Sequence, residues 1–300
     1  MRLTRSIRKG LIRKLRPIWT QENLLTVAFK NQVKRQLVDK IKKAKTIEEV
    51  EEIIGKFSID ALQTQIDQMS KSTFNKSSKE FDLIMDAFLK NPKNAYLNLR
   101  AKNLLHNRSD YQKFLNAYKH NVSLIKDLPR DLFKKFKQAY LHGTAFRGTA
   151  LAKELYTRLG KRAKVIIRTE SSNITSTLTQ ARMQKIGLNA YIWSTSEDSR
   201  VRGSHALLDG VLFFWNDPPT IDNYQNHCGR FINCRCVPIP VASLDDIKFP
   251  VKVAHSLNIQ TKYIKGNGKI KGHSESKIIS GSIIRYPREG FIKEFGDQFL

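Results

Sequence analysis

Apolar residues recur every three or four positions over most of the first half of the chain, from about residue 20 to residue 160. This period predicts amphipathic helices whose apolar faces pack together in a core. The clearest stripes are Phe29, Val33, Leu37 and Ile41; Ile59, Leu62, Ile66 and Met69; Tyr111, Phe114, Tyr118, Val122 and Ile125; and Leu151, Leu155 and Leu159. The region therefore reads as a helical bundle or an extended helical arm.

Several helix ends are also encoded in this region. Thr46 and Glu49 have the spacing of a capping box, and they predict a short helix that stops at Gly55. Pro129 suits the first turn of a helix, because its missing N–H would have no partner there. Gly160 follows an apolar stripe and predicts a helix end.

The pattern changes at residue 164. The β-branched run Lys164–Thr169 predicts a strand, and Ser171–Ile186 predicts a helix that ends at Gly187. The apolar runs Tyr191–Trp193 and Val211–Phe214 predict further strands. After Pro240 the chain is rich in Gly, Ser and Lys with short strand-like pieces, which predicts a loosely packed extension.

The predicted fold class is α+β, with a mainly helical N-terminal region, a small α+β module and a loosely packed C-terminal extension. The expected boundaries are a basic amphipathic arm at 1–19, a helical region at 20–162, the α+β module at 163–242 and a lysine-rich extension at 243–300.

Charge adds a functional expectation. Lys and Arg number 53 against 27 Asp and Glu, which leaves a net charge of +26. A field of this size favours a polyanionic partner such as nucleic acid, an anionic membrane surface or an acidic protein. A solvated surface kept for solubility is the simpler alternative. No apolar run approaches the roughly 18 residues that span a bilayer, so we expect no stable membrane span.

Basic residues concentrate in the first 16 positions, which hold no acidic residue. Leucine and isoleucine recur there every four residues, so a helix would carry an apolar stripe beside a cationic face. Such an arm fits a membrane surface, nucleic acid or an acidic protein, and a disordered tail remains a fourth interpretation. The candidate contacts for DNA or a protein partner are Arg2, Arg5, Arg8, Lys9, Arg13, Lys14 and Arg16, with Lys34, Arg35, Lys42 and Lys43 further along.

Three cysteines lie between positions 228 and 236, in a chain whose N-terminus lacks the apolar stretch of a secretory signal, so we expect a reducing compartment rather than a disulfide framework. Cys228, Cys234 and Cys236 with His205 or His227 would supply the four ligands of a tetrahedral zinc site. The Cys-x-Cys spacing is tighter than in common zinc motifs. Three thiols in an apolar core are therefore the competing interpretation, and a disulfide is a third.

Asp198, His205 and Asp209 allow a different interpretation, as the acid–base or metal-binding set of a DNA-processing nuclease. The alternative is a structural network in which Asp198 pairs with Arg202 and Asp209 orients His205. We favour the network, because no nucleophile or substrate pocket is evident. An ADP-ribosyltransferase site, with Arg168 and Ser194-Thr195-Ser196, lacks the downstream Glu-x-Glu that its chemistry needs.

An ordered set of residues in this region resembles the phage Mu F-like head morphogenesis family, the minor capsid proteins of tailed bacteriophages. The resemblance covers roughly a quarter of the chain. Its members are Arg168, Asn173, Arg182, Gly187, Trp193, Thr195, Asp198, Arg202, His205, Asp209 and Gly210, and the closing run Asn233, Cys234, Arg235 and Cys236 with Pro238.

The resemblance implies a virion protein of low copy number inside the head, assembled in the host cytoplasm. It implies association with the portal protein during procapsid assembly and contact with packaged double-stranded DNA, with scaffolding or major capsid protein as further partners. The family has no settled catalytic activity, so we expect no enzyme. The Cys and His residues described above leave one structural zinc ion as the only cofactor that we expect. A membrane-acting, ejected protein is a separate possibility that rests on the N-terminal arm.

Overall fold

The structure, a computed structural model, describes residues 20–75, 108–142, 145–264 and 273–299. The described residues divide into a helical unit, within residues 20–75 and 109–171, and a sheet unit, within residues 172–264 and 273–299. The basic arm at 1–19 lies outside the described residues, as do the side chains of Tyr111 and Phe114. The predicted α+β class is confirmed, with helices followed by a sheet.

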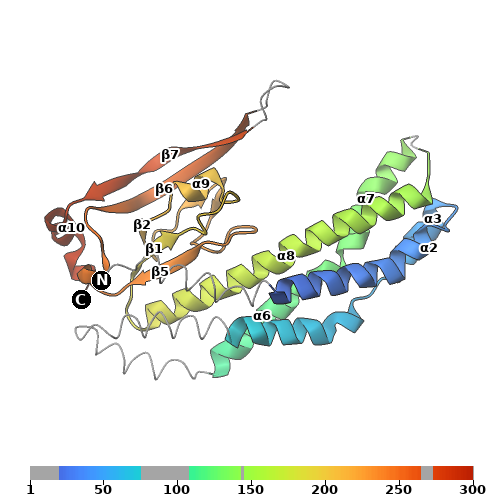
Figure 1. Ribbon diagram of the computed structural model, residues 1–300, viewed down its shortest axis with the longest axis horizontal. Coiled ribbons are helices and arrows are strands. Elements are labelled where there is room, and N and C mark those ends of the chain that lie inside the picture. Colours follow the sequence, from blue (N-terminus) through green and yellow to red (C-terminus); the bar gives the residue numbers. More distant parts are fainter. Residues whose placement is uncertain (1–19, 76–107, 143–144, 265–272, 300) are drawn as a thin grey trace. The chain divides into compact units, whose positions relative to one another are not determined.

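Helices make up the described part of the helical unit (Figure 1). They are a helix at 20–33, a π-helical turn η1 (Lys34–Val38), α2 (Asp39–Ile41), α3 (Ile47–Gly55), η2 (Asp60–Leu62), a helix at 63–75, α6 (Arg108–Ser123), η4 (Leu124–Lys126), α7 (Leu128–Leu141) and the first part of α8 (Gly148–Lys185).

The predicted stripes form the core of this unit. Phe29, Leu37 and Ile41 are fully buried, as the spacing of three or four residues requires for one helix face. The predicted cap at Thr46 is confirmed, because its side chain accepts a hydrogen bond from the Glu49 amide at 3.2 Å. α7 begins at Leu128 with a proline in its first turn, also as predicted.

The strand predicted at 164–169 is wrong, because α8 continues as a helix through this segment and through Gly160. The stripe of buried residues runs on at four-residue spacing through Ala163 and Ile167, both fully buried. Tertiary packing of this face outweighs the weak strand preference of the β-branched residues. Gly160 serves a different purpose from a helix end: an added Cβ would meet the Lys30 side chain at 3.0–3.2 Å.

The sheet unit holds the last part of α8 and a mixed sheet. Its elements are β1 (Ala190–Ser194), α9 (Gly203–Ala206), β2 (Val211–Phe214), β3 (Thr220–Ile221), β4 (Tyr224–Gln225), β5 (Val237–Val241), η5 (Leu244–Asp246), β6 (Val251–Ile264), β7 (His273–Tyr286), α10 (Arg288–Phe295) and η6 (Gly296–Gln298). The strands predicted at 191–193 and 211–214 are confirmed, as is the helix end before Gly187, whose φ is +87°.

The strand order is β4-β3-β6-β2-β1-β5, and β7 pairs with β6. β1 is antiparallel to both β2 and β5, whereas β2 and β3 run parallel to successive parts of β6. β6 and β7 are the two longest strands and form an antiparallel pair, with α10 at one end (Figure 1). The sheet therefore brings segments from 190 to 286 into one layer.

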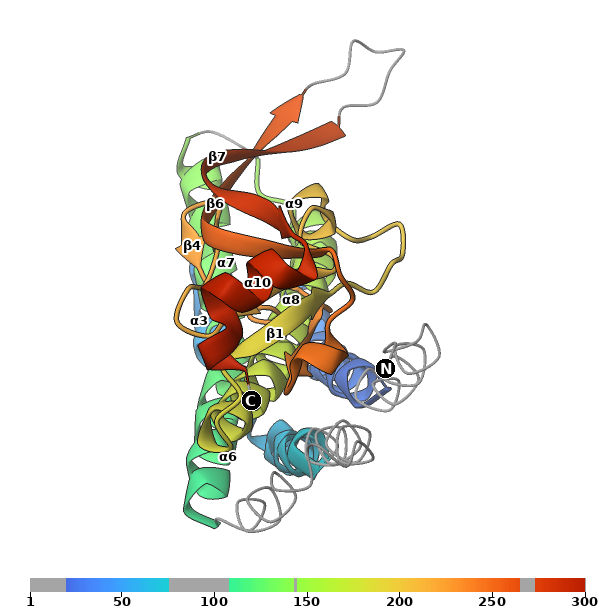
Figure 2. The same cartoon turned by 90° about the vertical axis from the view of Figure 1, so that its left-hand side faces the viewer.

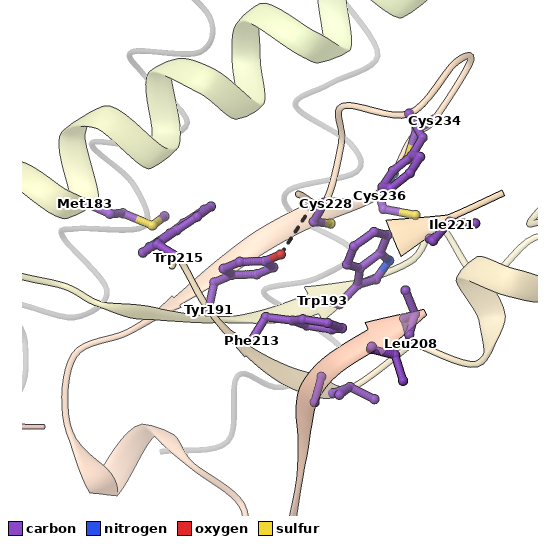
Figure 3. Close-up of a cluster of buried hydrophobic side chains, with 14 of the residues drawn as sticks. Met183, Tyr191, Trp193, Leu208, Phe213, Trp215, Ile221, Cys228, Cys234 and Cys236 are labelled. Atoms are coloured by element: carbon purple, nitrogen blue, oxygen red, sulfur yellow. Dashed lines mark hydrogen bonds between the residues drawn. The ribbon is translucent and has the colours of Figure 1, made fainter. Parts of the chain in front are cut away.

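Alternate residues of the central strands feed two cores, as the two-residue period of a strand dictates. On one face, Tyr191 and Trp193 of β1 pack with Phe213 of β2 and with Met183 of α8 (Figure 3). On the other face, α10 covers the sheet (Figure 2), and its Phe291 packs with Leu212 and Val253.

This packing differs from the loose C-terminal extension expected from composition. Residues 251–264 and 273–286 are strands of the sheet, and Phe291, Phe295 and Phe299 pack in its second core. The Gly-, Ser- and Lys-rich composition concealed the strands because much of β7 is exposed, so polar side chains are acceptable there.

Candidate functional site

The polar residues of the module lie in two loops at one end of β1. The first loop follows Ser194 and leads through α9 to Gly210, whose φ of +74° allows its amide to donate to the Trp193 carbonyl at 2.8 Å. The second loop, residues 226–236, precedes β5. β5 pairs with β1, so the second loop ends beside the strand from which the first begins.

Asp198 and Arg235 join the two loops. The guanidinium donates two hydrogen bonds to the carboxylate, at 2.6 and 2.7 Å. These bonds, with help from the Arg200 amide, lower the pKa of Asp198 to about 2. The predicted partner Arg202 was wrong: Arg202 instead donates to the Ile232 carbonyl at 2.6 Å and so forms a second link between the loops.

Asp209 holds the start of the first loop. One of its carboxylate oxygens accepts from the Thr195 amide at 2.8 Å and from the Thr195 hydroxyl at 2.9 Å. We predicted that Asp209 would orient His205, but these bonds direct it to the end of β1. Asp209 therefore stabilises the start of the loop between β1 and α9.

His205 lies in α9, and its imidazole faces two sulfur atoms of the second loop. Nδ1 is 3.5 Å from Cys234 Sγ and 3.4 Å from Cys236 Sγ. All three residues are buried, and their candidate ligand atoms lie within 4.8 Å of one another. Among the described residues, no other set of three or more His, Cys, Asp or Glu side chains meets this condition.

The sequence also placed Cys228 and His227 among the candidate ligands. Cys228 is fully buried in the same core but lies outside this three-residue group. His227 lies on the same face of β1 but further along it, where its Nδ1 is 3.2 Å from the Tyr191 hydroxyl and its ring contacts Trp215. Burial, and then the nearby Arg230, lower the pKa of His227 to about 4, so its imidazole is neutral near pH 7.

The thiols are protonated in the absence of a metal ion. Hydrogen bonding with Cys236, followed by burial, raises the pKa of Cys234. Hydrogen bonding with Cys228 raises that of Cys236, and burial raises that of Cys228. None of the three forms a disulfide, so the predicted alternative of a cystine is wrong for this structure.

Two serines of α8 that the sequence analysis missed hold the second loop against the helix. Ser172 donates to the Gly229 carbonyl at 2.8 Å, and Ser176 donates to the Cys228 carbonyl. Gly229 has a φ of +85°, and a Cβ there would meet Ser176 Cβ at 3.0 Å. Serines four apart on one helix face were visible in the sequence, but nothing local indicated their partners.

The remaining residues of the resemblance serve separate structural roles. Arg168 forms an ion pair with Glu22 inside the helical unit, at 3.4 Å. Asn173 and Arg182 are half-buried on α8, in the sheet unit. Asn233 has a φ of +54°, a left-handed conformation that asparagine tolerates in turns.

The nuclease interpretation needs Asp198, His205 and Asp209 around one ion. Only His205 belongs to the cluster found among the described residues. Asp198 and Asp209 are committed to Arg235 and Thr195. The arrangement favours the structural network that we expected, although with different pairs.

The basic candidates of the helical unit are all exposed. Lys34 and Arg35 are in η1, and Lys42 and Lys43 directly follow α2. Lys42 is within 3.7 Å of Asp39, an exposed contact that leaves most of its charge available to a partner. Among the described residues, no helix is long and apolar enough to cross a membrane.

Comparison with known proteins supports the resemblance. Residues 132–239 match the family described as Phage Mu protein F like protein, so the predicted resemblance is confirmed over this segment, which begins earlier than we expected. The chain is also similar to a protein of Haemophilus influenzae described as "Uncharacterized protein", with 38% identity over 148 residues. That match covers 47% of this chain and only 32% of the relative. No solved structure matches.

Proposed function

We propose that this protein is a minor head protein of a tailed bacteriophage, which associates with the portal protein during procapsid assembly and contacts packaged double-stranded DNA. The observation that carries the proposal is the match of residues 132–239 to the Mu F-like family, which suggests a head morphogenesis protein. That family is one of structural head proteins, which suggests that the partners of this protein take part in capsid assembly.

The charge supports DNA as the polyanionic partner. A net charge of +26 is suited to a protein that works beside densely packed phosphates. Each phosphate that a Lys or Arg neutralises releases a condensed counterion, so affinity falls steeply with salt. The fold is consistent with two separate roles. The polar pairs of the sheet unit bind each other inside it, whereas Lys34, Arg35, Lys42 and Lys43 are exposed on the helical unit.

Portal association is tested by co-expression of the full chain with the portal protein of the same phage. We expect the two proteins to elute together at physiological salt from a size-exclusion column. Separate elution, together with the absence of this protein from purified heads, would remove the head-protein assignment.

DNA contact is tested by titrating the full chain with a duplex of mixed sequence at several salt concentrations. The slope of log K against log salt is negative for binding to phosphates. Reversing four charges should reduce its magnitude by about 3 to 4, since each lost phosphate contact contributes about 0.9. The test set is Lys34→Glu, Arg35→Glu, Lys42→Glu and Lys43→Glu. The matched control, with the same charge change on exposed positions of β6 and β7, is Lys252→Glu, Lys262→Glu, Lys277→Glu and Arg285→Glu.

The difference between the two charge-reversal sets shows which surface contacts DNA. A larger loss in the control set would move the DNA contact to the β6–β7 pair. Reversal of Arg5, Arg8, Arg13 and Lys14 tests the N-terminal arm in the same assay, and we expect it to weaken binding as well. Wild-type binding that hardly changes with salt would contradict DNA contact through phosphates.

A further inference from the structure

The loops of the sheet unit hold the His205, Cys234 and Cys236 side chains together without any need for an ion. Arg235, between the two cysteines, is fixed by Asp198, and the Ile232 carbonyl is fixed by Arg202. The Cys234 amide closes a turn onto the Phe231 carbonyl at 3.0 Å. The three donor atoms are therefore pre-positioned, which lowers the entropic cost of binding a ligand between them.

The two nitrogen–sulfur distances of the cluster are those of a tetrahedral zinc site. Zinc binds cysteine sulfur at about 2.3 Å and histidine nitrogen at about 2.0–2.1 Å, so a tetrahedral angle places sulfur and nitrogen about 3.5 Å apart. His205 Nδ1 lies 3.5 Å from Cys234 Sγ and 3.4 Å from Cys236 Sγ. Both nitrogen–sulfur distances therefore fit a shared zinc ion without movement of the side chains.

Hydrogen bonding alone satisfies this imidazole poorly. Nδ1 has either one proton or one lone pair, so it can form only one good bond with the two sulfurs that face it. Nε2 is buried and has no hydrogen-bond partner within the described residues. The cost of this burial is not relieved at Nδ1 by one weak bond to sulfur, whereas an ion between Nδ1 and the two sulfurs would engage these three atoms at once and leave Nε2 as the protonated nitrogen.

The surroundings select the kind of ion. Ring contacts with Trp193 and Phe231 enclose His205, with centroids 5.5 and 5.3 Å away, so the net charge of the site must be small. Two thiolates neutralise a divalent cation, and a sulfur and nitrogen donor set suits zinc rather than magnesium or calcium.

We propose that His205 Nδ1, Cys234 Sγ and Cys236 Sγ bind one Zn²⁺ ion, with the fourth tetrahedral position left to a small ligand such as water. The ion cross-links α9 to the loop before β5 and thereby stabilises the sheet unit. Cys228, which lies outside the three-atom group, is not a ligand in this assignment.

Metal analysis of the untagged full chain, purified without chelators, tests the proposal. We expect near one zinc per chain in the wild type and in the control Cys228→Ser. Cys234→Ser, Cys236→Ser and His205→Asn should each bind Zn²⁺ at least tenfold more weakly in competition with a chromophoric chelator, a lower bound set by the effect of losing even an outer-shell partner.

A second measurement guards against variants that fail to fold. Wild-type chain freed of metal is titrated with Co²⁺, which should produce the charge-transfer and visible bands of tetrahedral cobalt–thiolate coordination and saturate at one equivalent. A wild type that is isolated without zinc and gives no such bands would overturn the proposal. Loss of metal from Cys228→Ser to the same degree as from Cys236→Ser would overturn the assignment of ligands.

Discussion

The ion pair between Asp198 and Arg235 gives the sharpest prediction of stability. Asp198→Asn keeps the shape of the side chain but removes its charge, and it leaves an arginine that is only 12% exposed facing a neutral amide. Two charge-assisted bonds are lost, and the pair is intermediate between exposed pairs, at about 0–1 kcal/mol, and buried pairs, whose breaking costs about 3–5 kcal/mol. We therefore expect the free energy of unfolding of the sheet unit to fall by about 2 kcal/mol.

The pKa of Asp198 leads to a similar value. A shift from 3.8 to about 2 corresponds to roughly 2.4 kcal/mol at about 1.36 kcal/mol per unit. Asp198 is 33% exposed, so solvent screening reduces this figure to about 1–2 kcal/mol. Because the folded pKa is depressed, the contribution is complete above the ordinary pKa of 3.8 and is lost as the pH falls towards 2.

Urea unfolding followed by the fluorescence of Trp193 and Trp215 measures the effect, since both tryptophans are in the core of the sheet unit. The matched control is Arg200→Gln, because Arg200 meets the same carboxylate at 3.4 Å but is 73% exposed. We expect this control to cost less than about 0.5 kcal/mol. Equal effects of the two variants at pH 7, or an undiminished effect of Asp198→Asn at pH 2, would refute the reasoning.

Two further predictions concern the backbone and a buried acid. Gly281→Ala should destabilise the sheet unit by about 2–4 kcal/mol, because its Cβ would lie 2.3 Å from the Ser256 carbonyl oxygen. The control Gly210→Ala has the same φ of +74° but open space around its Cβ, so it should cost only about 1 kcal/mol in urea unfolding. Equal costs of the two variants would exclude the clash as the cause. Burial, which outweighs Arg168, raises the pKa of Glu22 to about 7, so the wild type should lose stability as pH rises from 4.5 to 7 and Glu22→Gln should not. Parallel thermal melts of both proteins across this range test the second prediction.

The helical unit could be predicted largely from the sequence, because its pattern is local. The helix at 20–33 buries the face that its spacing indicates, and Thr46 caps α3 as expected. The errors came where two local signals competed. Lys164–Thr169 has the composition of a strand, but the segment is helical because Ile167 continues the buried stripe of α8 at four-residue spacing.

The sheet unit was less predictable, because its order depends on contacts distant in sequence. β6 pairs with β2, β3 and β7, and nothing local in Val251–Ile264 indicates three neighbours. Exposure of β7 lets it carry the polar composition that suggested a loose extension. The two α8 serines that hold the second loop were missed because their partners, Gly229 and Cys228, are 57 and 52 residues away in the sequence.

The sequence by itself determined the fold class, the order of residues that matches the Mu F-like family and the concentration of His and Cys in one module. Only the tertiary structure decided which of these side chains meet. It paired Asp198 with Arg235 rather than Arg202, and it placed His205 against Cys234 and Cys236 but not Cys228. Spacing along the chain fixes which residues share a helix face or strand face, whereas partners 29 to 37 residues apart, such as these, depend on how the strands align.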